Sequence, residues 1–370
     1  MKIESFLNSI DAMKLEPLTL SGLPLRNPVV LAPMTTYSSS PEGIVTQEEL
    51  RYLGRRAKQG FGMVMTAACY VHKTGHAFPG QWRCDTDDVI ASSLRPVADL
   101  IKRNGAAAVL QIHHGGRMGS RELSGRLLSA SAIPSPRPGS ETPDEMTLEE
   151  IREVISSFGQ AARRAKESGY DGVEIHGANT YLLQQFVSPH SNRRTDAYGR
   201  DRNLFSTQVV ESVLAAVGPD YPVGYRFSPE ELETPGVRIG DTFALLDRLM
   251  GYQLAWLHVS ISDFKGSSIN GDYDEPTLSL LHRYIAGRIP LIGVGGVQTM
   301  QDIEDCLKMG CEFVAVAKAA ITDPDWLRVV LNSGTPKLVF PKDDAESKLD
   351  IPRGLADRIR RAPGWLEIEA

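Results

Sequence analysis

Eight short apolar runs alternate along the chain with segments of helical pattern, and this alternation constrains the fold more than any other feature. The runs are apolar throughout, which is typical of parallel strands that are buried on both faces. We predict strands at residues 28–32, 62–67, 107–112, 172–175, 222–226, 255–260, 290–294 and 313–317. Eight strand–helix repeats favour an α/β fold of the (β/α)8 barrel type, also called a TIM barrel.

The segments between the runs carry signals for helix starts and stops. Two pairs of residues fit a capping box, namely Thr46 with Glu49 and Thr147 with Glu150. Asp323 followed by Pro324 fits an N-cap and a first helical residue. Helices are expected to stop before the next strand at three glycines, Gly105, Gly169 and Gly310.

A doubly wound open sheet is the competing architecture, and it ranks second because no GxGxxG follows the first predicted strand. The Pro- and Ser-rich segment 115–146 follows the third strand, so we expect a long excursion over the mouth of the barrel. We divide the chain into a barrel domain, residues 1–335, and a polar C-terminal tail, residues 336–370. The tail is expected to wrap the barrel or to contact a neighbouring subunit.

Charge, cysteine spacing and hydropathy limit the binding partners and the cellular compartment that we expect. The net charge of −6 and the absence of a long basic run argue against nucleic-acid binding. The four cysteines show no CxxC spacing, which argues against a zinc or iron–sulfur site and favours a reducing compartment. The N-terminus lacks a signal pattern and no apolar run is long enough to span a bilayer, so we expect a cytoplasmic protein.

Polar residues stand where several predicted strands end, and in barrels of this type the strand ends build the active site. The stretch HGANTY places His176, Asn179 and Tyr181 directly after the fourth strand. These residues stand at positions i, i+3 and i+5. On a straight strand their side chains would point to both faces, so the spacing suits a strand that bends into a loop. His113 and His114 are adjacent on a strand and therefore point to opposite sides, so we expect no metal site there.

The stretch HGANTYLLQQFVSPHSNRRTDAYG, residues 176–199, is long and specific. Four shorter stretches support it: LAPMTTYS at 31–38, QIHHGGR at 111–117, GVGGVQT at 293–299 and VAVAKAAITDPDW at 314–326. In these stretches the sequence resembles the old yellow enzyme family, the FMN-dependent ene-reductases and NADH:flavin oxidoreductases with a (β/α)8 barrel. The resemblance covers residues 15–335 and implies FMN as cofactor and NADH or NADPH as hydride donor.

The resemblance also implies which residues contact FMN. Thr35 corresponds to the residue that bonds flavin O4, Gln111 to the one at the pyrimidine edge, and Arg226 to the cation beside N1 and O2. Packing and phosphate contacts are implied for Ala32, Pro33, Met34, Ala67, Gly295, Gly296, Ala317 and Lys318. The family often has Gly-Arg where this chain has Ala317-Lys318, and lysine lacks the bidentate fork that arginine offers to phosphate.

For the chemistry, the resemblance implies that His176 and Asn179 bind the activating oxygen of a small-molecule alkene and that Tyr181 donates a proton. Two donors aimed at this oxygen stabilise the charge that develops on it during hydride transfer. Tyr37 is a candidate for the wall of the substrate pocket. Arg361, near Gly-Trp, is a candidate for a residue that reaches into the active site of a neighbouring subunit.

Several alternatives stay open. The barrel is alternatively a flavin-free lyase or aldolase in which Lys318 forms a Schiff base, or a flavin-binding barrel without catalysis. Arg226 alternatively forms a structural ion pair with Glu174, and Arg117 is either a ligand contact or a loop cation. The sequence leaves the substrate, the choice between NADH and NADPH, and the formation of a homo-oligomer undecided.

Overall fold

The computed structural model describes residues 15–369. The N-terminal stretch in which we expect no signal pattern lies mostly outside this range, as do residue 370 and the start of the predicted barrel domain. The strands that form the barrel are β3 (Val29–Leu31), β4 (Met63–Met65), β6 (Ala107–His113), β9 (Gly172–Gly177), β10 (Val223–Phe227), β11 (Trp256–Val259), β12 (Leu291–Val294) and β13 (Phe313–Val316). Each lies within or across one of the runs predicted to be a strand, so all eight strand predictions are confirmed.

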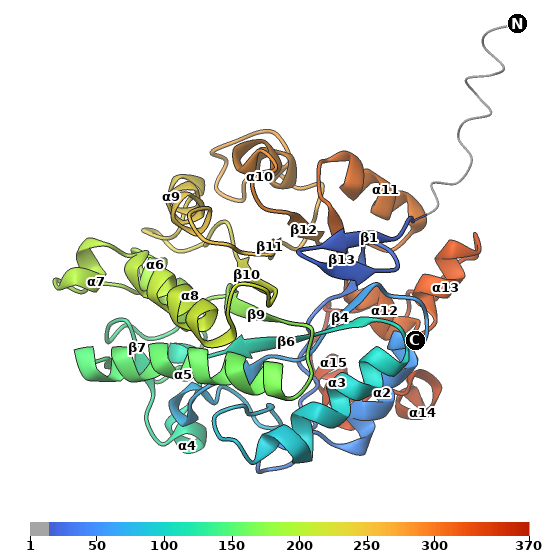
Figure 1. The fold of residues 1–370 in the computed structure, drawn as a ribbon, viewed down its shortest axis with the longest axis horizontal. Coiled ribbons are helices and arrows are strands. Elements are labelled where there is room, and N and C mark those ends of the chain that lie inside the picture. Colours follow the sequence, from blue (N-terminus) through green and yellow to red (C-terminus); the bar gives the residue numbers. More distant parts are fainter. Residues whose placement is uncertain (1–14, 370) are drawn as a thin grey trace, which may run out of the picture.

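The strands pair in parallel and close into a ring. The order is β4-β3-β13-β12-β11-β10-β9-β6, and β4 pairs with β6 to complete the barrel, with Met63 opposite Ala107. A two-residue strand, β5 (Cys69–Tyr70), extends the pairing beside the end of β6. This closure confirms the (β/α)8 barrel and excludes the doubly wound sheet. Figure 1 shows the helices arranged around the outside of the barrel.

The helices begin and end largely where the sequence predicts. The longer ones are α2 (Gln47–Ala57), α3 (Arg95–Arg103), α5 (Leu148–Glu167), α8 (Leu204–Val217), α9 (Ile239–Leu249), α10 (Thr277–Ile285) and α11 (Met300–Lys308). Shorter turns of helix are α4 (Arg121–Ser124), α6 (Leu182–Val187), α7 (Ala197–Arg200), α12 (Lys318–Thr322), α13 (Trp326–Leu331), η1 (Lys73–Gly75), η2 (Ile90–Leu94) and η3 (Gly116–Met118). Capping boxes form at Thr46 and Thr147 as predicted.

One predicted helix start is wrong by two residues. The N-cap of α13 is Asp325, and Asp323 lies outside the helix. The Asp323 carboxylate instead accepts the Asp325 backbone N–H at 3.0 Å and the Lys337 N–H at 3.1 Å. A short aspartate side chain satisfies a turn as readily as a helix start, because both expose free N–H groups two or three residues ahead.

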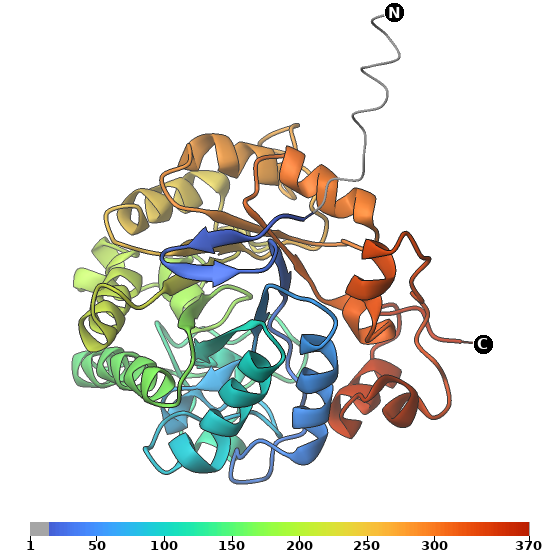
Figure 2. The same cartoon turned by 45° about the vertical axis from the view of Figure 1, so that its right-hand side comes forward.

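A hairpin covers one end of the barrel. It consists of β1 (Leu18–Leu20) and β2 (Leu23–Leu25), which Figure 2 shows lying across the strands. Leu20 and Leu25 are buried in the same cluster as interior barrel residues such as Val30 and Ile292. The hairpin precedes the first barrel strand, so its apolar side chains close the end of the barrel at which the strands start, opposite the predicted site.

The excursion after β6 packs against α6 and the segment that follows it. It contains a short parallel pair, β7 (Leu128–Ser129) and β8 (Asp144–Glu145). The Ser129 hydroxyl donates to the Gln185 side chain at 3.0 Å, and the Arg193 N–H donates to the Ser131 hydroxyl at 3.0 Å. The excursion therefore lies at the carboxyl ends of the strands, as predicted.

Residues from the C-terminal segment share the hydrophobic core of the barrel. This segment contains α14 (Ala345–Leu349) and α15 (Arg353–Arg360). Phe340, Leu349, Leu355 and Ile359 are buried in one cluster with barrel residues. Figure 2 shows these helices beside the barrel, at the C-terminal end of the colour scale. The division of the chain at residue 335 stays a prediction.

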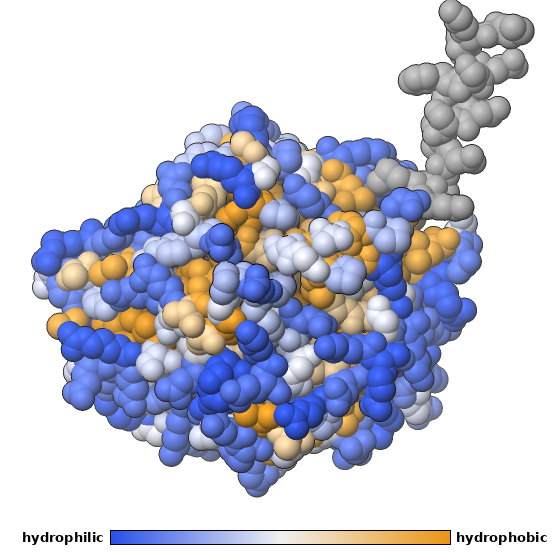
Figure 3. Space-filling view, viewed as in Figure 1, coloured by the Kyte–Doolittle hydropathy of each residue, from blue (hydrophilic) through white to orange (hydrophobic). Residues whose placement is uncertain are grey.

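The face drawn in Figure 3 is largely hydrophilic, with hydrophobic residues exposed in several separate groups. Within residues 15–369, no helix is both long enough and apolar enough to cross a membrane.

Candidate active site

A cavity of about 520 Å³ opens where the barrel strands end, and it is the centre of the candidate site. Its lining gathers eight residues predicted for the cofactor or the substrate: Ala32, Pro33, Met34, Thr35, Tyr37, Asn179, Arg226 and Ala317. Its volume falls in the range of ligand sites. A larger cleft of about 800 Å³ is lined mainly by α2 and α3 and contains no strand end, so it does not compete for this role.

His176 lies on β9, is 4 % exposed, and has its proton in a defined place. Its Nδ1 accepts the backbone N–H of Ala178 at 3.2 Å, so in the neutral ring the proton is on Nε2. Burial, with additional effects of His113 and Arg226, holds the pKa of His176 well below its usual range. His176 is therefore a neutral hydrogen-bond donor through Nε2 at physiological pH.

The chain turns sharply after β9. Asn179 and Thr180 have φ angles of 56° and 62°, in the left-handed region. Asparagine tolerates this region better than most residues, and the bend brings Tyr181 back over the strand end. The ring of Tyr181 lies edge to face with the rings of His176 and His113, at centroid distances of 5.1 and 4.2 Å. The bend predicted from the HGANTY spacing is thus present.

Tyr181 keeps its proton over the physiological range, because burial raises the pKa of its phenol to about 12. His113 is buried beneath it, and its Nδ1 accepts from Gln81 at 3.0 Å, which places the proton on Nε2. Burial lowers the pKa of His113 to about 3. The three rings therefore form a neutral group that holds two N–H donors and one O–H donor.

Two serines hold the side chain of Asn179, and the sequence reasoning missed both. Ser260, directly after β11, donates to Oδ1 of Asn179 at 2.9 Å. Ser228, directly after β10, accepts the Asn179 backbone N–H at 2.9 Å and donates to Oδ1 at 3.4 Å. Polar residues that follow apolar strands were the available signal, since both serines continue such runs.

Arg226 lies on β10 between two histidines. The strand register places it opposite His176 of β9 and opposite His258 of β11. Arg226 is 8 % exposed, and its guanidinium donates to the Ser260 hydroxyl at 3.2 Å, while its Nε has no partner among the described residues. A buried N–H without a partner costs free energy unless a ligand satisfies it, so Arg226 has the properties of a ligand contact.

Glu174 does not pair with Arg226, which the sequence left open as a structural ion pair. Its carboxylate accepts from Gln111 at 2.8 Å, from the Trp256 indole at 3.0 Å and from His258 Nδ1 at 2.8 Å. Burial opposes ionisation of Glu174, but His258 and Arg226 outweigh it and the pKa is lowered. Among residues 15–369, Arg226 forms no ion pair within 4 Å. Burial lowers the pKa of His258, so its contact with Glu174 is a hydrogen bond, and Arg226 is left available to the cavity.

The remaining predicted cofactor residues are not part of the cavity lining. Ala67 is buried after β4, and the Gln111 amide nitrogen is bonded to Glu174. Gly295 follows β12 with a φ of 122°, and a Cβ there would lie 2.9 Å from the backbone of the loop after β11. Only glycine fits this close approach. Their roles toward FMN stay predictions.

Lys318 and Gly296 complete the predicted phosphate region. Lys318 is the first residue of α12 and is exposed, and Gly296 has a φ of 72°. Lys318 is not part of the cavity lining, so no observation favours a Schiff base at this position. Ala317, its neighbour, does line the cavity.

The C-terminal segment supplies part of the cavity wall. Arg358 of α15, with Ala362 and Trp365, lines it from the same chain. The segment is anchored beside the cavity, because the Gly354 N–H donates to the Ser38 hydroxyl at 2.9 Å. These three residues were not predicted. Arg361 is not part of the lining, and its role toward a neighbouring subunit stays a prediction.

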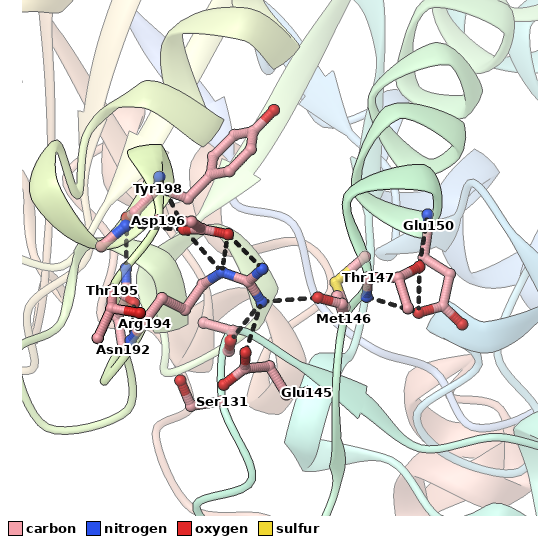
Figure 4. Close-up of polar contacts among 12 residues, drawn as sticks. Ser131, Glu145, Met146, Thr147, Glu150, Asn192, Arg194, Thr195, Asp196 and Tyr198 are labelled. Atoms are coloured by element: carbon pink, nitrogen blue, oxygen red, sulfur yellow. Dashed lines mark hydrogen bonds and ion pairs between the residues drawn. The ribbon is translucent and has the colours of Figure 1, made fainter.

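The second half of the HGANTY…DAYG motif has a structural role. Arg194 has a side chain that is 5 % exposed, and it donates to the backbone carbonyls of Ala130 at 3.0 Å and Met146 at 2.7 Å. It also pairs with Asp196, which accepts the N–H groups of Tyr198 and Gly199 at the start of α7. Figure 4 shows this cluster joining the excursion to the loop after β9. The motif therefore anchors the excursion as well as supplying polar residues of the candidate site.

The donor set fits a flavin better than a metal. Within residues 15–369, no group of three or more His, Cys, Asp or Glu side chains is placed to hold a metal ion. The cavity instead combines the apolar stretch at Ala32–Met34 with the free Nε–H of Arg226. A planar ring with a polar edge that gains negative charge on reduction matches both features. A barrel with such a site at its strand ends belongs to the class of flavin-binding oxidoreductases.

The sequence agrees with this class. It matches the NADH:flavin oxidoreductase / NADH oxidase family over residues 15–336, and the chain belongs to that family. The cofactor of the family is FMN, and its relatives are named for NADH or for NADPH. The old yellow enzyme resemblance is thereby confirmed.

Several known proteins are similar to this chain over most of its length. The chain is 42% identical over 328 residues to the NADH:acrylate oxidoreductase of Vibrio harveyi, covering 85% of this chain and 32% of that protein. It is 36% identical over 366 residues to the probable NADH-dependent flavin oxidoreductase YqiG of Bacillus subtilis, covering 95% and 96%. Among solved structures, the old yellow enzyme from Trypanosoma cruzi matches with a TM-score of 0.76 and 27% identity, covering 87% and 93%. The chain thus spans about a third of the Vibrio relative.

Proposed function

We propose that the protein transfers hydride from NADH or NADPH through FMN to an activated C=C bond, such as that of an enone or a nitroalkene. The observation that carries this proposal is the neutral His176 with its proton on Nε2, beside the phenol of Tyr181. A histidine that donates without carrying charge suits a substrate oxygen that becomes negative only during the reaction.

The three polar residues after β9 and at its end have different roles in this proposal. His176 Nε2–H and the Asn179 amide donate to the oxygen conjugated with the alkene. Tyr181 donates its proton to the α-carbon, while the β-carbon receives the hydride. Two electrons and two hydrogens are thereby added across the double bond, and the phenol recovers its proton from solvent.

FMN, when bound, would accept hydride from the nicotinamide and donate it to the alkene. The residues proposed to hold it are Ala32, Pro33, Met34, Thr35, Ala67, Gln111, Arg226, Gly295, Gly296, Ala317 and Lys318. Arg226 would place its positive charge at the edge of the ring that becomes negative on reduction. Tyr37 would border the substrate, because it lines the same cavity as Asn179.

A substrate screen tests this function. NADH and NADPH consumption is measured against enones, nitroalkenes, maleimides and quinones, with the product identified by NMR. Acrylate belongs in the panel because the Vibrio relative is named for it. We expect saturated products and turnover that depends on His176. Oxidation of nicotinamide by oxygen alone, with every alkene recovered unchanged, would contradict the proposal.

A further inference from the structure

The Asn179 amide has two orientations that differ by a half turn, and only one of them presents N–H groups to the cavity. In the structure Oδ1 faces Ser260 and Ser228, while Nδ2 has no partner within residues 15–369. Asn179 also lines the cavity of about 520 Å³. The free donor is therefore on the side where a substrate oxygen would lie.

Each serine hydroxyl accepts one N–H and has its own proton left to donate. Ser260 accepts from the Arg226 guanidinium at 3.2 Å, and a guanidinium can only donate. Ser228 accepts from the backbone N–H of Asn179 at 2.9 Å. Both hydroxyls donate their proton to Asn179 Oδ1. Turning the amide around would leave these protons without this acceptor and would aim Oδ1 at the substrate oxygen.

The serines are themselves fixed by the barrel. Ser228 and Ser260 directly follow β10 and β11, and the Ser260 N–H donates to the Phe227 carbonyl at 2.8 Å, which continues the pairing of the two strands. Ser228 also holds the backbone of Asn179, which has a φ of 56°. The strand ends therefore set both the backbone and the amide orientation of Asn179.

We infer that Ser228 and Ser260 are positioning residues that keep the Asn179 amide turned so that Nδ2 donates to the activated oxygen of the substrate. This inference rests on the proposed function, because it assigns a task to Asn179. It adds that the chain Arg226–Ser260–Asn179 links the cation expected beside the flavin to the substrate donor.

The test measures binding of 4-hydroxybenzaldehyde to the purified FMN-loaded protein, followed by the change in the flavin absorbance spectrum. We expect Ser260→Ala and Ser228→Ala each to raise the Kd about fivefold, the effect of one lost hydrogen bond. Ser260→Thr, which keeps the hydroxyl, should restore binding to within about twofold. Ser267→Ala, on the same loop and exposed, is the matched control and should bind as the wild type does.

A double-mutant comparison separates positioning from a general structural effect. In an Asn179→Ala background, Ser260→Ala should cause no further loss, because the serine acts through the missing amide. The inference is overturned if the fivefold loss persists in that background, or if both alanine variants bind as tightly as the wild type. Flavin content and Tm, measured for each variant, show that the fold is retained.

The outcome also distinguishes the inference from the proposed function. If the wild type binds no FMN, the proposed function and the positioning role of the serines are both contradicted. If the wild type is yellow, is bleached by NADH and reduces alkenes, while the serine variants are unchanged, only the positioning role falls.

Discussion

The rings of His113 and Tyr181 lie edge to face with their centroids 4.2 Å apart, and the phenol is thereby held over the end of β9. The contact joins the third and fourth barrel strands at the level of His176. The phenol, whose pKa burial raises to about 12, therefore stays protonated beside His176, which suits the proposed role of Tyr181 as proton donor.

We therefore expect Tyr181→Phe to slow alkene reduction by about 100-fold or more, the usual effect of losing a general acid. Reduction of the flavin by NADH involves no such proton and should change by less than about twofold. Stopped-flow absorbance measures the two half-reactions separately. Tyr273→Phe, at an exposed tyrosine, is the control. An equal loss in both half-reactions would contradict the proton-donor role.

His176 and Asn179 are expected to act together on the substrate oxygen. Replacing either by alanine should lower kcat/KM for alkene reduction by roughly 100-fold, the effect of one lost donor to a developing oxyanion. The double variant should lose the charge-transfer band that phenols give with the flavin. A double variant that still shows the band at wild-type phenol concentrations would remove the pair from this role.

Arg194 is expected to contribute to stability rather than to chemistry. Arg194→Met removes the donor to the carbonyls of Ala130 and Met146 and the charged partner of Asp196. We expect a loss of about 3 kcal/mol in the free energy of unfolding, because breaking a buried charged network is costly. Arg193→Met, at the exposed neighbour, should cost less than about 0.5 kcal/mol. Equal losses at the two positions would show that the cluster in Figure 4 does not hold the excursion.

The buried His113 predicts how stability depends on pH. Its pKa is about 3 in the folded protein and about 6.5 in the unfolded chain, so between these values the unfolded state binds more protons. Stability should therefore fall as pH falls from 6 to 5, by about 1 kcal/mol from this residue alone. Urea unfolding of His113→Gln should show a shallower decrease by that amount. Parallel pH profiles of the variant and the wild type would contradict the neutral, buried state of His113.

The sequence predicted the barrel well because parallel strands are buried on both faces. The eight strands are mostly apolar, and some, such as Val29–Leu31 and Phe313–Val316, are apolar throughout, so they stand out against helical patterns. The hairpin β1–β2 was not predicted, since three-residue strands with one buried end carry little periodicity. The prediction that Asp323 caps a helix was wrong because its side chain accepts a hydrogen bond within a turn before the helix.

The site was predictable only in part. Asn179 could be proposed from the sequence because it follows a strand within the longest family stretch, and Arg226 because it ends an apolar run. Ser228 and Ser260 contact Asn179, and Arg358 lines the cavity, from segments distant in sequence, and spacing along the chain does not reveal such contacts. The Glu174–His258 pair was missed for the same reason, because the two residues meet across the barrel interior.

The central claim is that a ring of strand ends holds FMN beneath a donor pair formed by His176 and Asn179. The most direct measurement is the absorbance spectrum of the purified protein during an anaerobic titration with NADH. We expect a flavin spectrum with about one FMN per chain, bleached by NADH and restored by an enone. A colourless protein that fails to bind added FMN would contradict the account.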